Sequence, residues 1–152
     1  MTFSRTAKDL VISTAHGMQG QLQMITRGRS EVAQSCQIPD LREHYQALGL
    51  PDRNGQFVEI GGYDGESWSN TSFLADQGWR GVYVEPIPEF ARRIRLRHLF
   101  NKVTVERVAV GDEEKEIAIA QMGSLTTANA ATERAYESIE WAKGATDAKK
   151  KI

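Results

Sequence analysis

The feature that most constrains this fold is a block in which two apolar runs, each with an acidic residue at or next to its end, flank a glycine turn and a helical stretch. The first run covers 57–60, the glycine turn 61–65, and the second run 82–85. A strand, a glycine turn, a helix and a second strand in this order form half of a nucleotide-binding α/β unit. The block therefore predicts that backbone donors of the turn and a carboxylate at the second strand end meet in one crevice.

Strand and helix patterns alternate through the middle of the chain. Apolar runs predict strands over 57–60, 82–85 and 103–110, and periodic apolar residues predict helices over 38–50 and 88–100. Strands that alternate with helices predict an α/β fold whose parallel sheet is joined by right-handed crossovers.

The helix between the first two strands has its own start and stop signals. Ser69 or Asn70 can cap its start, and Gly78 stands where a left-handed C-cap is needed. Backbone N–H groups at such a start are free to bind an anionic group.

The two ends of the chain depart from this pattern. Residues 1–35 are polar, and we predict an N-terminal arm there that is weakly structured or contains one short helix. After the third strand, a polar turn and alternating residues over 116–121 predict a β-hairpin. A helix over 131–143 and a charged tail over 148–152 follow.

Charge and composition argue against several classes of function. The 152 residues have a formal net charge of −1, which gives no electrostatic case for binding nucleic acid or an anionic membrane. Cys36 is the single cysteine, and His16, His44 and His98 lack ligand spacing, so we expect no disulfide and no metal site. No run approaches the roughly 20 apolar residues of a membrane span, and no signal-peptide core is present, so a cytoplasmic protein is the default expectation.

The acidic residues around the glycine turn favour a cationic ligand. The glycines do not meet the G-x-G-x-x-G pattern of dinucleotide sites, and Glu59, Asp64 and Glu66 would repel a pyrophosphate. S-adenosylmethionine has a sulfonium and an ammonium but no phosphate. Its carboxylate can use the N–H groups of the helix start near 69–71.

Glu85 strengthens this interpretation. It ends the second strand, 26 residues after Glu59, which is close to the offset of about 20 residues expected for a ribose-binding acid. A carboxylate there can accept hydrogen bonds from both ribose hydroxyls.

Taken together, these residues resemble the FkbM family of S-adenosylmethionine-dependent methyltransferases. The resemblance runs from about 55 to 152 and rests on Gly62-Tyr63-Asp64-Gly65-Glu66, Ser69-Asn70-Thr71, Gly78-Trp79-Arg80-Gly81, Val84-Glu85-Pro86, Val108-Ala109-Val110-Gly111-Asp112 and Ser124-Leu125. It implies a Rossmann-like class I methyltransferase fold. It also implies methyl transfer, usually to a hydroxyl of a sugar or of another small-molecule or polymer acceptor.

The resemblance assigns roles by position. Glu59, Gly61 and Gly65 would line the methionine end of the cofactor, Glu85 would hold the ribose, and Ile87 would flank the adenine. The full predicted cofactor-binding set is Glu59, Gly61, Gly62, Tyr63, Asp64, Gly65, Asn70, Glu85, Pro86, Ile87, Ala109 and Val110. No catalytic base is assigned, because Asp64 and Glu66 are only the nearest carboxylates.

The sequence also departs from the family. A further strand with an acidic motif normally lies beside the transferred methyl group, and this chain ends near the approach to that strand. We therefore expect 36–152 to be an N-terminal, incomplete portion of a methyltransferase domain, which associates with itself or with a completing partner chain. Two alternatives stay open, namely a non-catalytic cofactor-binding or assembly remnant and an NAD-binding oxidoreductase domain.

A basic run on the predicted helix over 88–100 is interpreted as a solvated face, because apolar residues take the inner positions. The basic residues are Arg92, Arg93, Arg95, Arg97 and His98, and the inner residues are Phe90, Ile94, Leu96 and Phe100.

Overall fold

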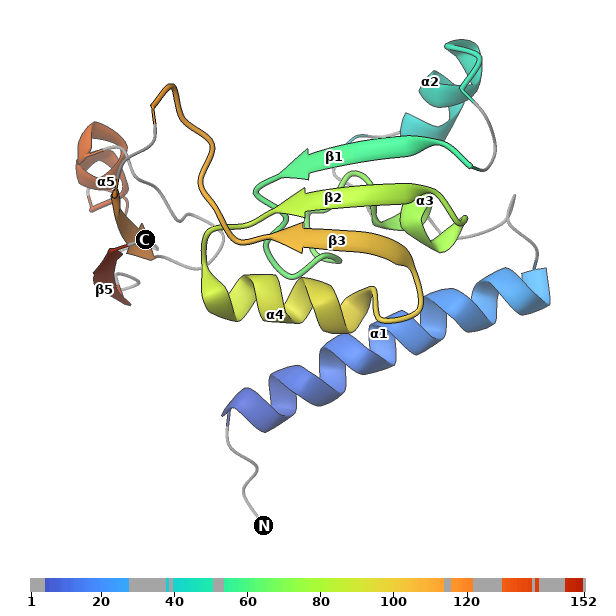
Figure 1. Cartoon of the computed structure of the whole chain (residues 1–152), viewed down its shortest axis with the longest axis horizontal. Helices are drawn as coiled ribbons and strands as arrows, with labels where there is room; N and C mark the ends of the chain where they lie inside the picture. Colours follow the sequence, from blue (N-terminus) through green and yellow to red (C-terminus); the bar gives the residue numbers. More distant parts are fainter. Residues whose placement is uncertain are drawn as a thin grey trace. The chain divides into compact units, whose positions relative to one another are not determined.

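The computed structural model describes residues 5–27, 38, 40–50, 54–113, 116–121, 130–137, 139 and 147–151. Its elements are α1 (Arg5–Arg27), α2 (Leu41–Ala47), β1 (Gln56–Ile60), α3 (Ser72–Asp76), β2 (Arg80–Val84), α4 (Pro88–Arg97), β3 (Lys102–Glu106), β4 (Ala118–Gln121), α5 (Ala130–Glu137) and β5 (Asp147–Lys151) (Figure 1). They form two compact units, Met1–Ala109 and Val110–Ile152.

The first unit is built on a parallel sheet with the strand order β1-β2-β3. Ile60 pairs with Val84, and Val84 pairs with Glu106, so the three strands end at the same edge. The predicted parallel α/β arrangement is thus confirmed, and it is consistent with a Rossmann-like fold. The third strand ends four residues before the predicted limit of 110, and Val108 beyond it is exposed.

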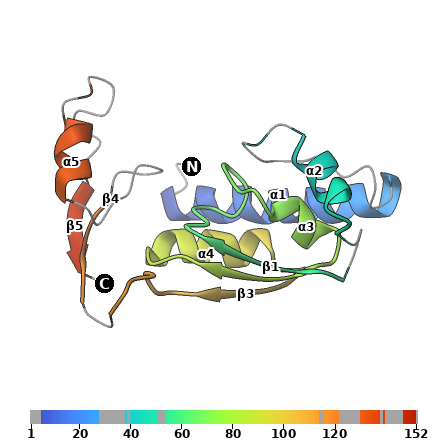
Figure 2. The same ribbon diagram turned by 90° about the horizontal axis from the view of Figure 1, so that it is seen from above.

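The crossover helices α3 and α4 cover one face of this sheet, and α1 lies over α4 (Figure 2). Phe57 and Tyr83 point toward the helices and meet edge to face, with ring centroids 5.6 Å apart. Beside them, α2 contributes Leu41 to a buried cluster with residues of α3 and with Trp79. This packing fixes the helices that carry the loops at the strand ends.

The prediction for the N-terminal arm was wrong, because α1 is a helix of 23 residues. Its inner face uses small residues, with Ser13 and Gly17 buried, whereas Val11 and Met18 are exposed. A Cβ on Gly17 would lie 2.4 Å from the carbonyl oxygen of Arg97, so only glycine allows this close approach. The usual signal of an apolar buried stripe is therefore missing from the sequence.

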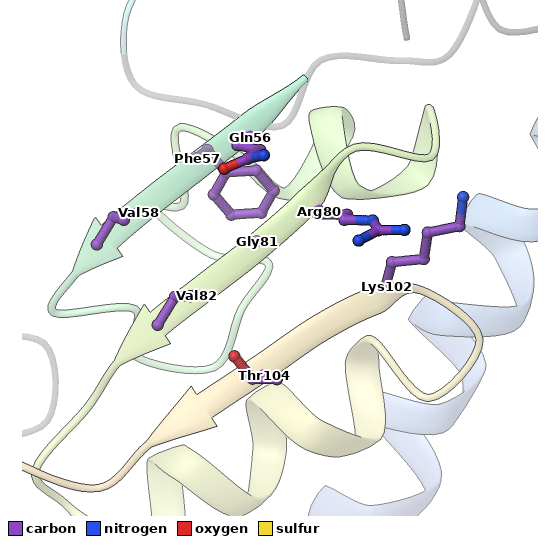
Figure 3. Close-up of a pocket in the computed structure, with 8 residues that line it drawn as sticks. All are labelled: Gln56, Phe57, Val58, Arg80, Gly81, Val82, Lys102 and Thr104. Carbon is purple, nitrogen blue, oxygen red and sulfur yellow. The ribbon is translucent and has the colours of Figure 1, made fainter. Parts of the chain in front are cut away.

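The opposite face of the sheet is exposed. Val58 and Ile60 of β1 are 64% and 65% exposed. Figure 3 shows Val58, Val82 and Thr104 on this face, at a hollow of about 800 Å³. The hollow is lined by Gln56, Phe57, Val58, Arg80, Gly81, Val82, Lys102 and Thr104. It lies on the strands themselves, away from the loops that follow their carboxyl ends.

The second unit contains α5 and an antiparallel pair of β4 with β5. The predicted hairpin after the third strand is not shown, because β4 pairs with β5 at the end of the chain. The predicted charged tail is largely β5. The predicted helix over 131–143 is described as far as Glu137, and Ser124, Leu125 and Cys36 lie outside the described residues.

Among the helices of the described residues, none has both the length and the hydropathy that a bilayer crossing needs.

Candidate functional site

The loop after β1 and the residue after β2 meet at the carboxyl edge of the sheet. The Gly61 N–H donates to the Val84 carbonyl at 2.9 Å. The Glu85 carboxylate accepts from the Tyr63 N–H at 3.1 Å and from the Ile87 N–H at 2.9 Å. The structure therefore brings the glycine turn and Glu85 together, as the sequence predicted.

Glu85 is only 4% exposed. Burial raises the pKa of its carboxyl group, and the backbone hydrogen bonds from Ile87 and Tyr63 oppose that rise. Each carboxylate oxygen accepts one backbone N–H and keeps a second acceptor position. Glu85 thus has unused acceptor capacity next to the turn.

Glu59 has a local partner set. Its carboxylate accepts from the Ser69 hydroxyl at 2.7 Å, from the Asn70 N–H at 3.1 Å and from the Thr71 hydroxyl. The Thr71 hydroxyl also lies 3.2 Å from the Tyr83 hydroxyl. Burial, and then the nearby Glu59, raise the pKa of Tyr83, so that the phenol stays protonated. Glu59 thus anchors the loop that leads into α3.

The start of α3 does not offer the free donors that the sequence predicted. Thr71 occupies the N-cap position and makes no side-chain cap hydrogen bond. The Ser69 hydroxyl instead accepts from the N–H groups of Thr71 at 3.3 Å and Ser72 at 3.0 Å. Since the Asn70 N–H is bound to Glu59, these three donors already have acceptors within the chain and are not free, contrary to the expectation from the sequence.

The acids of the turn also have partners. Asp64 accepts from the N–H groups of Glu66 and Ser67 at 2.9 and 2.7 Å, which closes a tight local turn. Glu66 forms an ion pair with Arg97. Arg97 therefore offsets part of the negative charge of Glu66, although it also pairs with the carboxylate of Asp76.

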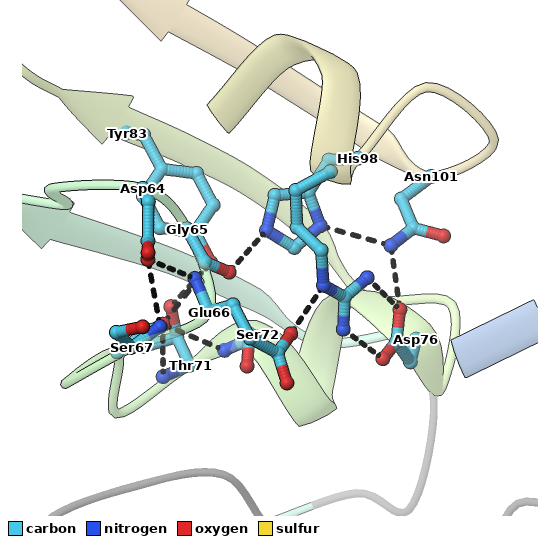
Figure 4. A network of polar contacts seen from close by, with 12 residues as sticks. Asp64, Gly65, Glu66, Ser67, Thr71, Ser72, Asp76, Tyr83, His98 and Asn101 are labelled. Atoms are coloured by element: carbon cyan, nitrogen blue, oxygen red, sulfur yellow. Dashed lines mark hydrogen bonds and ion pairs between the residues drawn. The ribbon is translucent and has the colours of Figure 1, made fainter. Parts of the chain in front are cut away.

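A buried polar network lies behind the turn (Figure 4). Arg97 donates to both carboxylate oxygens of Asp76, at 3.0 and 2.6 Å. Burial alone would lower the pKa of Arg97, but hydrogen bonds and charge from Asp76 and Glu66 raise it. Arg97 and His98 are each 3% exposed, so their interpretation as a solvated face was wrong. They lie three and four residues after Ile94, and therefore on the buried side of α4.

Burial, and then the charge of Arg97, lower the pKa of His98 to about 3. The neutral ring stacks on Tyr83, with centroids 5.0 Å apart. Phe100, which was predicted to point inward, is exposed.

The three glycines of the turn have different reasons to be glycine. A Cβ on Gly62 would lie 2.6 Å from the Tyr83 ring, and a Cβ on Gly65, at φ 77°, would lie 3.2 Å from His98 Nε2. A Cβ on Gly61 would meet nothing within 4 Å. Gly62 is thus required by packing, whereas Gly61, at φ 79°, and Gly65 are required by their left-handed backbone conformations, and Gly61 also borders open space.

Two bulky residues of the loop have left-handed backbone conformations. Tyr63 has φ 51° and Trp68 has φ 66°. Each such position costs about 1–3 kcal/mol and occurs preferentially in functional loops. Tyr63 also packs edge to face on Phe90, at 4.6 Å between centroids.

The remaining predicted residues lie in different surroundings. The Asn70 side-chain oxygen is buried and has no hydrogen-bond partner. Pro86 is half-buried, and Ile87 is fully buried at the start of α4. Ala109 is exposed beyond β3, and Val110 belongs to the second unit. The described residues contain no group of three or more His, Cys, Asp or Glu side chains that could hold a metal ion.

Sequence reasoning missed four residues of the network, namely Asp76, Arg97, His98 and Asn101. A usable signal was present in the helical spacing from Ile94 to Arg97 and His98. That spacing puts two polar residues on an apolar face, which requires buried partners.

Comparison with known proteins adds the family. The methyltransferase FkbM domain model matches residues 59–151. Searches of curated proteins and of solved structures return no match. The matched segment covers more than half of the chain and includes Glu59, the glycine turn, Glu85 and the network of α4. This chain therefore belongs to the FkbM methyltransferase family.

Proposed function

We propose that this chain binds S-adenosylmethionine and serves methyl transfer to a hydroxyl of a sugar or of another small-molecule or polymer acceptor. The family supports the reaction class. The observation that carries the cofactor proposal is the position of Glu85, which contacts the glycine turn through the Tyr63 N–H and keeps spare acceptor capacity.

The charges around the turn favour a sulfonium compound over a dinucleotide. A pyrophosphate needs available cations or N–H donors. Arg97 reaches the turn, but it is paired with both Asp76 and Glu66. Glu59 already accepts the N–H at the helix start. The site is therefore poorly suited to bind NAD.

Two details fit the proposed cofactor. Gly61 borders open space at the strand end, where a ligand can come close to the backbone. The buried oxygen of Asn70 lacks a donor, and an ammonium group is such a donor. When bound, S-adenosylmethionine would supply an electrophilic methyl group.

The residues of this chain would bind and orient the cofactor. Glu85 would accept hydrogen bonds from the ribose hydroxyls, while the Tyr63 and Ile87 N–H groups hold its carboxylate in place. Asp64 and Glu66 have structural partners, so neither is proposed as the catalytic base.

Calorimetric titration with S-adenosylmethionine, S-adenosylhomocysteine and NADH tests this function. We expect both sulfur compounds to bind the wild type. Glu85→Gln should weaken binding at least about tenfold, because it removes charge-assisted hydrogen bonds. Glu106→Gln is the matched control, since Glu106 ends β3 at the same sheet edge but is exposed, and its affinity should stay within about twofold of wild type.

The outcomes separate the alternatives. If the wild type binds neither S-adenosylmethionine nor S-adenosylhomocysteine, the cofactor proposal is refuted. If it binds NADH instead, an oxidoreductase is favoured. Unchanged affinity in Glu85→Gln would refute the ribose assignment alone. Binding without methyl transfer to any saccharide or hydroxyl acceptor would identify a non-catalytic member of the family.

A further inference from the structure

The end of the glycine turn at Gly65 and the next residue, Glu66, are held by side chains at the end of α4. His98 Nε2 lies 3.1 Å from the Gly65 carbonyl oxygen, and Arg97 pairs with the Glu66 carboxylate. Two adjacent side chains at the end of α4 thus bind two adjacent residues, and Figure 4 labels His98, Gly65 and Glu66 among them.

The holding side chains are themselves fixed. Arg97 forms a bidentate ion pair with Asp76. The Asn101 amide donates to Asp76 at 2.8 Å and to His98 Nδ1 at 2.9 Å. Because Nδ1 accepts this hydrogen bond, the ring proton of neutral His98 lies on Nε2 and is donated to Gly65. Arg97, His98 and Asn101 therefore each have defined hydrogen-bond partners.

The same turn reaches Glu85 from its other half. The Gly65 N–H donates to the Gly62 carbonyl at 2.8 Å, which closes the turn around Tyr63. Tyr63 in turn donates its N–H to Glu85. A displacement of Gly65 would therefore move the Tyr63 N–H away from the carboxylate that it orients.

We propose that Arg97 and His98 are positioning residues, which hold the glycine turn so that Glu85 is correctly oriented for the cofactor. The inference rests on the proposed function, because it gives that site its support. Stability alone does not explain the network, since well-packed apolar residues often replace buried ion pairs without loss of stability. A network of directed hydrogen bonds does fix geometry, as supporting residues do around other binding sites.

Two variants test the holding of the turn in the ligand-free protein. His98→Phe keeps the aromatic stack on Tyr83 but cannot donate a hydrogen bond to the Gly65 carbonyl. Arg97→Lys keeps the positive charge but loses the planar guanidinium group that forms the bidentate pair. Hydrogen exchange of the Glu66 and Ser67 amides should become at least about tenfold faster in both variants. Phe73→Leu, a core change outside the network, is the control for general destabilisation and should leave these two amides close to wild type.

The second measurement is the affinity for S-adenosylhomocysteine under conditions in which every variant is folded. We expect His98→Phe and Arg97→Lys to weaken binding by about tenfold or more, and Phe73→Leu to stay within about twofold of wild type. Wild-type affinity in both network variants, or unchanged exchange at Glu66 and Ser67, would overturn the inference. If the wild type does not bind S-adenosylhomocysteine, the proposed function fails, and the exchange measurement still decides whether α4 holds the turn.

Discussion

His98 makes the stability of the folded chain sensitive to acid. Its pKa is about 3 in the folded chain, against 6.5 for an ordinary histidine, because the ring is buried beside Arg97. Asp76 and the Gly65 carbonyl oppose this shift. Above pH 6.5 the ring is neutral in both states, so its contribution to stability is fully present. As the pH falls from 6.5 toward 3, only the unfolded chain takes up the proton, and the folded state loses stability.

We expect protonation of His98 in the unfolded chain to lower the free energy of unfolding by about 1–2 kcal/mol as the pH falls from 7 to 5. Urea unfolding of His98→Gln at the two pH values should lack this decrease, whereas His44→Gln, on the exposed side of α2, should keep the wild-type dependence. Glu85 acts in the opposite direction, because its raised pKa favours the folded state as the pH falls. The comparison with His98→Gln isolates the histidine, and an unchanged pH dependence in that variant would contradict the assignment.

The sequence predicted the meeting of the turn with Glu85 but missed the support behind it. The position of an acid at the end of a strand is a local property that one chain segment reveals. The burial of Arg97 depends on Asp76, which is 21 residues away and is brought close only by the packing of α3 on α4. The same packing turned the carboxylate of Glu66 toward Arg97, which the charge pattern alone did not indicate.

At the scale of elements, the contact of α1 with α4 depends on one glycine. Gly17→Ala would gain about 1 kcal/mol of helix propensity at an exposed site. Here the added methyl group would lie 2.4 Å from the Arg97 carbonyl oxygen and 3.2 Å from the carbonyl carbon, and backbone atoms cannot move aside cheaply. Overpacking of this kind costs about 1–3 kcal/mol. We therefore expect Gly17→Ala to be destabilising by about 1 kcal/mol.

Chemical denaturation measures this change. Ala15→Gly is the matched control, since Ala15 is exposed on the same helix and should lose about 1 kcal/mol of propensity. Glycine to alanine at position 17 and alanine to glycine at position 15 should thus both destabilise the chain. A stabilised Gly17→Ala variant would show that α1 does not approach α4 closely.

Elements with regular apolar spacing were predictable, and those without it were not. β2 and α4 bury residues at the expected periods, and β1 alternates exposed with half-buried residues, so the existence of these elements followed from the sequence. α1 buries Ser13 and Gly17, which carry no hydrophobic signal. β5 has the sequence Asp-Ala-Lys-Lys-Lys, and its pairing with β4 is a long-range contact that local propensity does not favour.

At the scale of the whole molecule, the exposed face of the sheet is a candidate surface for the predicted self-association. Parallel sheets are normally covered on both faces. Val58 and Ile60 make the β1 side of this face apolar, with Arg80 and Lys102 at the amino end of the neighbouring strands and Glu106 at the carboxyl end. Two copies stacked face to face, with their strands antiparallel, would bring the basic end of one copy onto the acidic end of the other. The predicted self-association thus has a candidate surface.

We expect light scattering to show a concentration-dependent increase in mass for the wild type, and a monomer for the double variant Val58→Thr, Ile60→Thr. Threonine keeps the β-branched shape that suits a strand, so the sheet should remain intact. Four apolar side chains leave the interface of a dimer, and at about 0.7 kcal/mol each the dissociation constant should rise about a hundredfold. Leu48→Thr is the control, because Leu48 is 74% exposed at the end of α2, outside this face, and should associate as the wild type does. In this arrangement the apolar side chains supply the attraction between the copies, and the charges determine only their orientation. A wild type that stays monomeric at high concentration, or a double variant that still associates, would therefore exclude this surface.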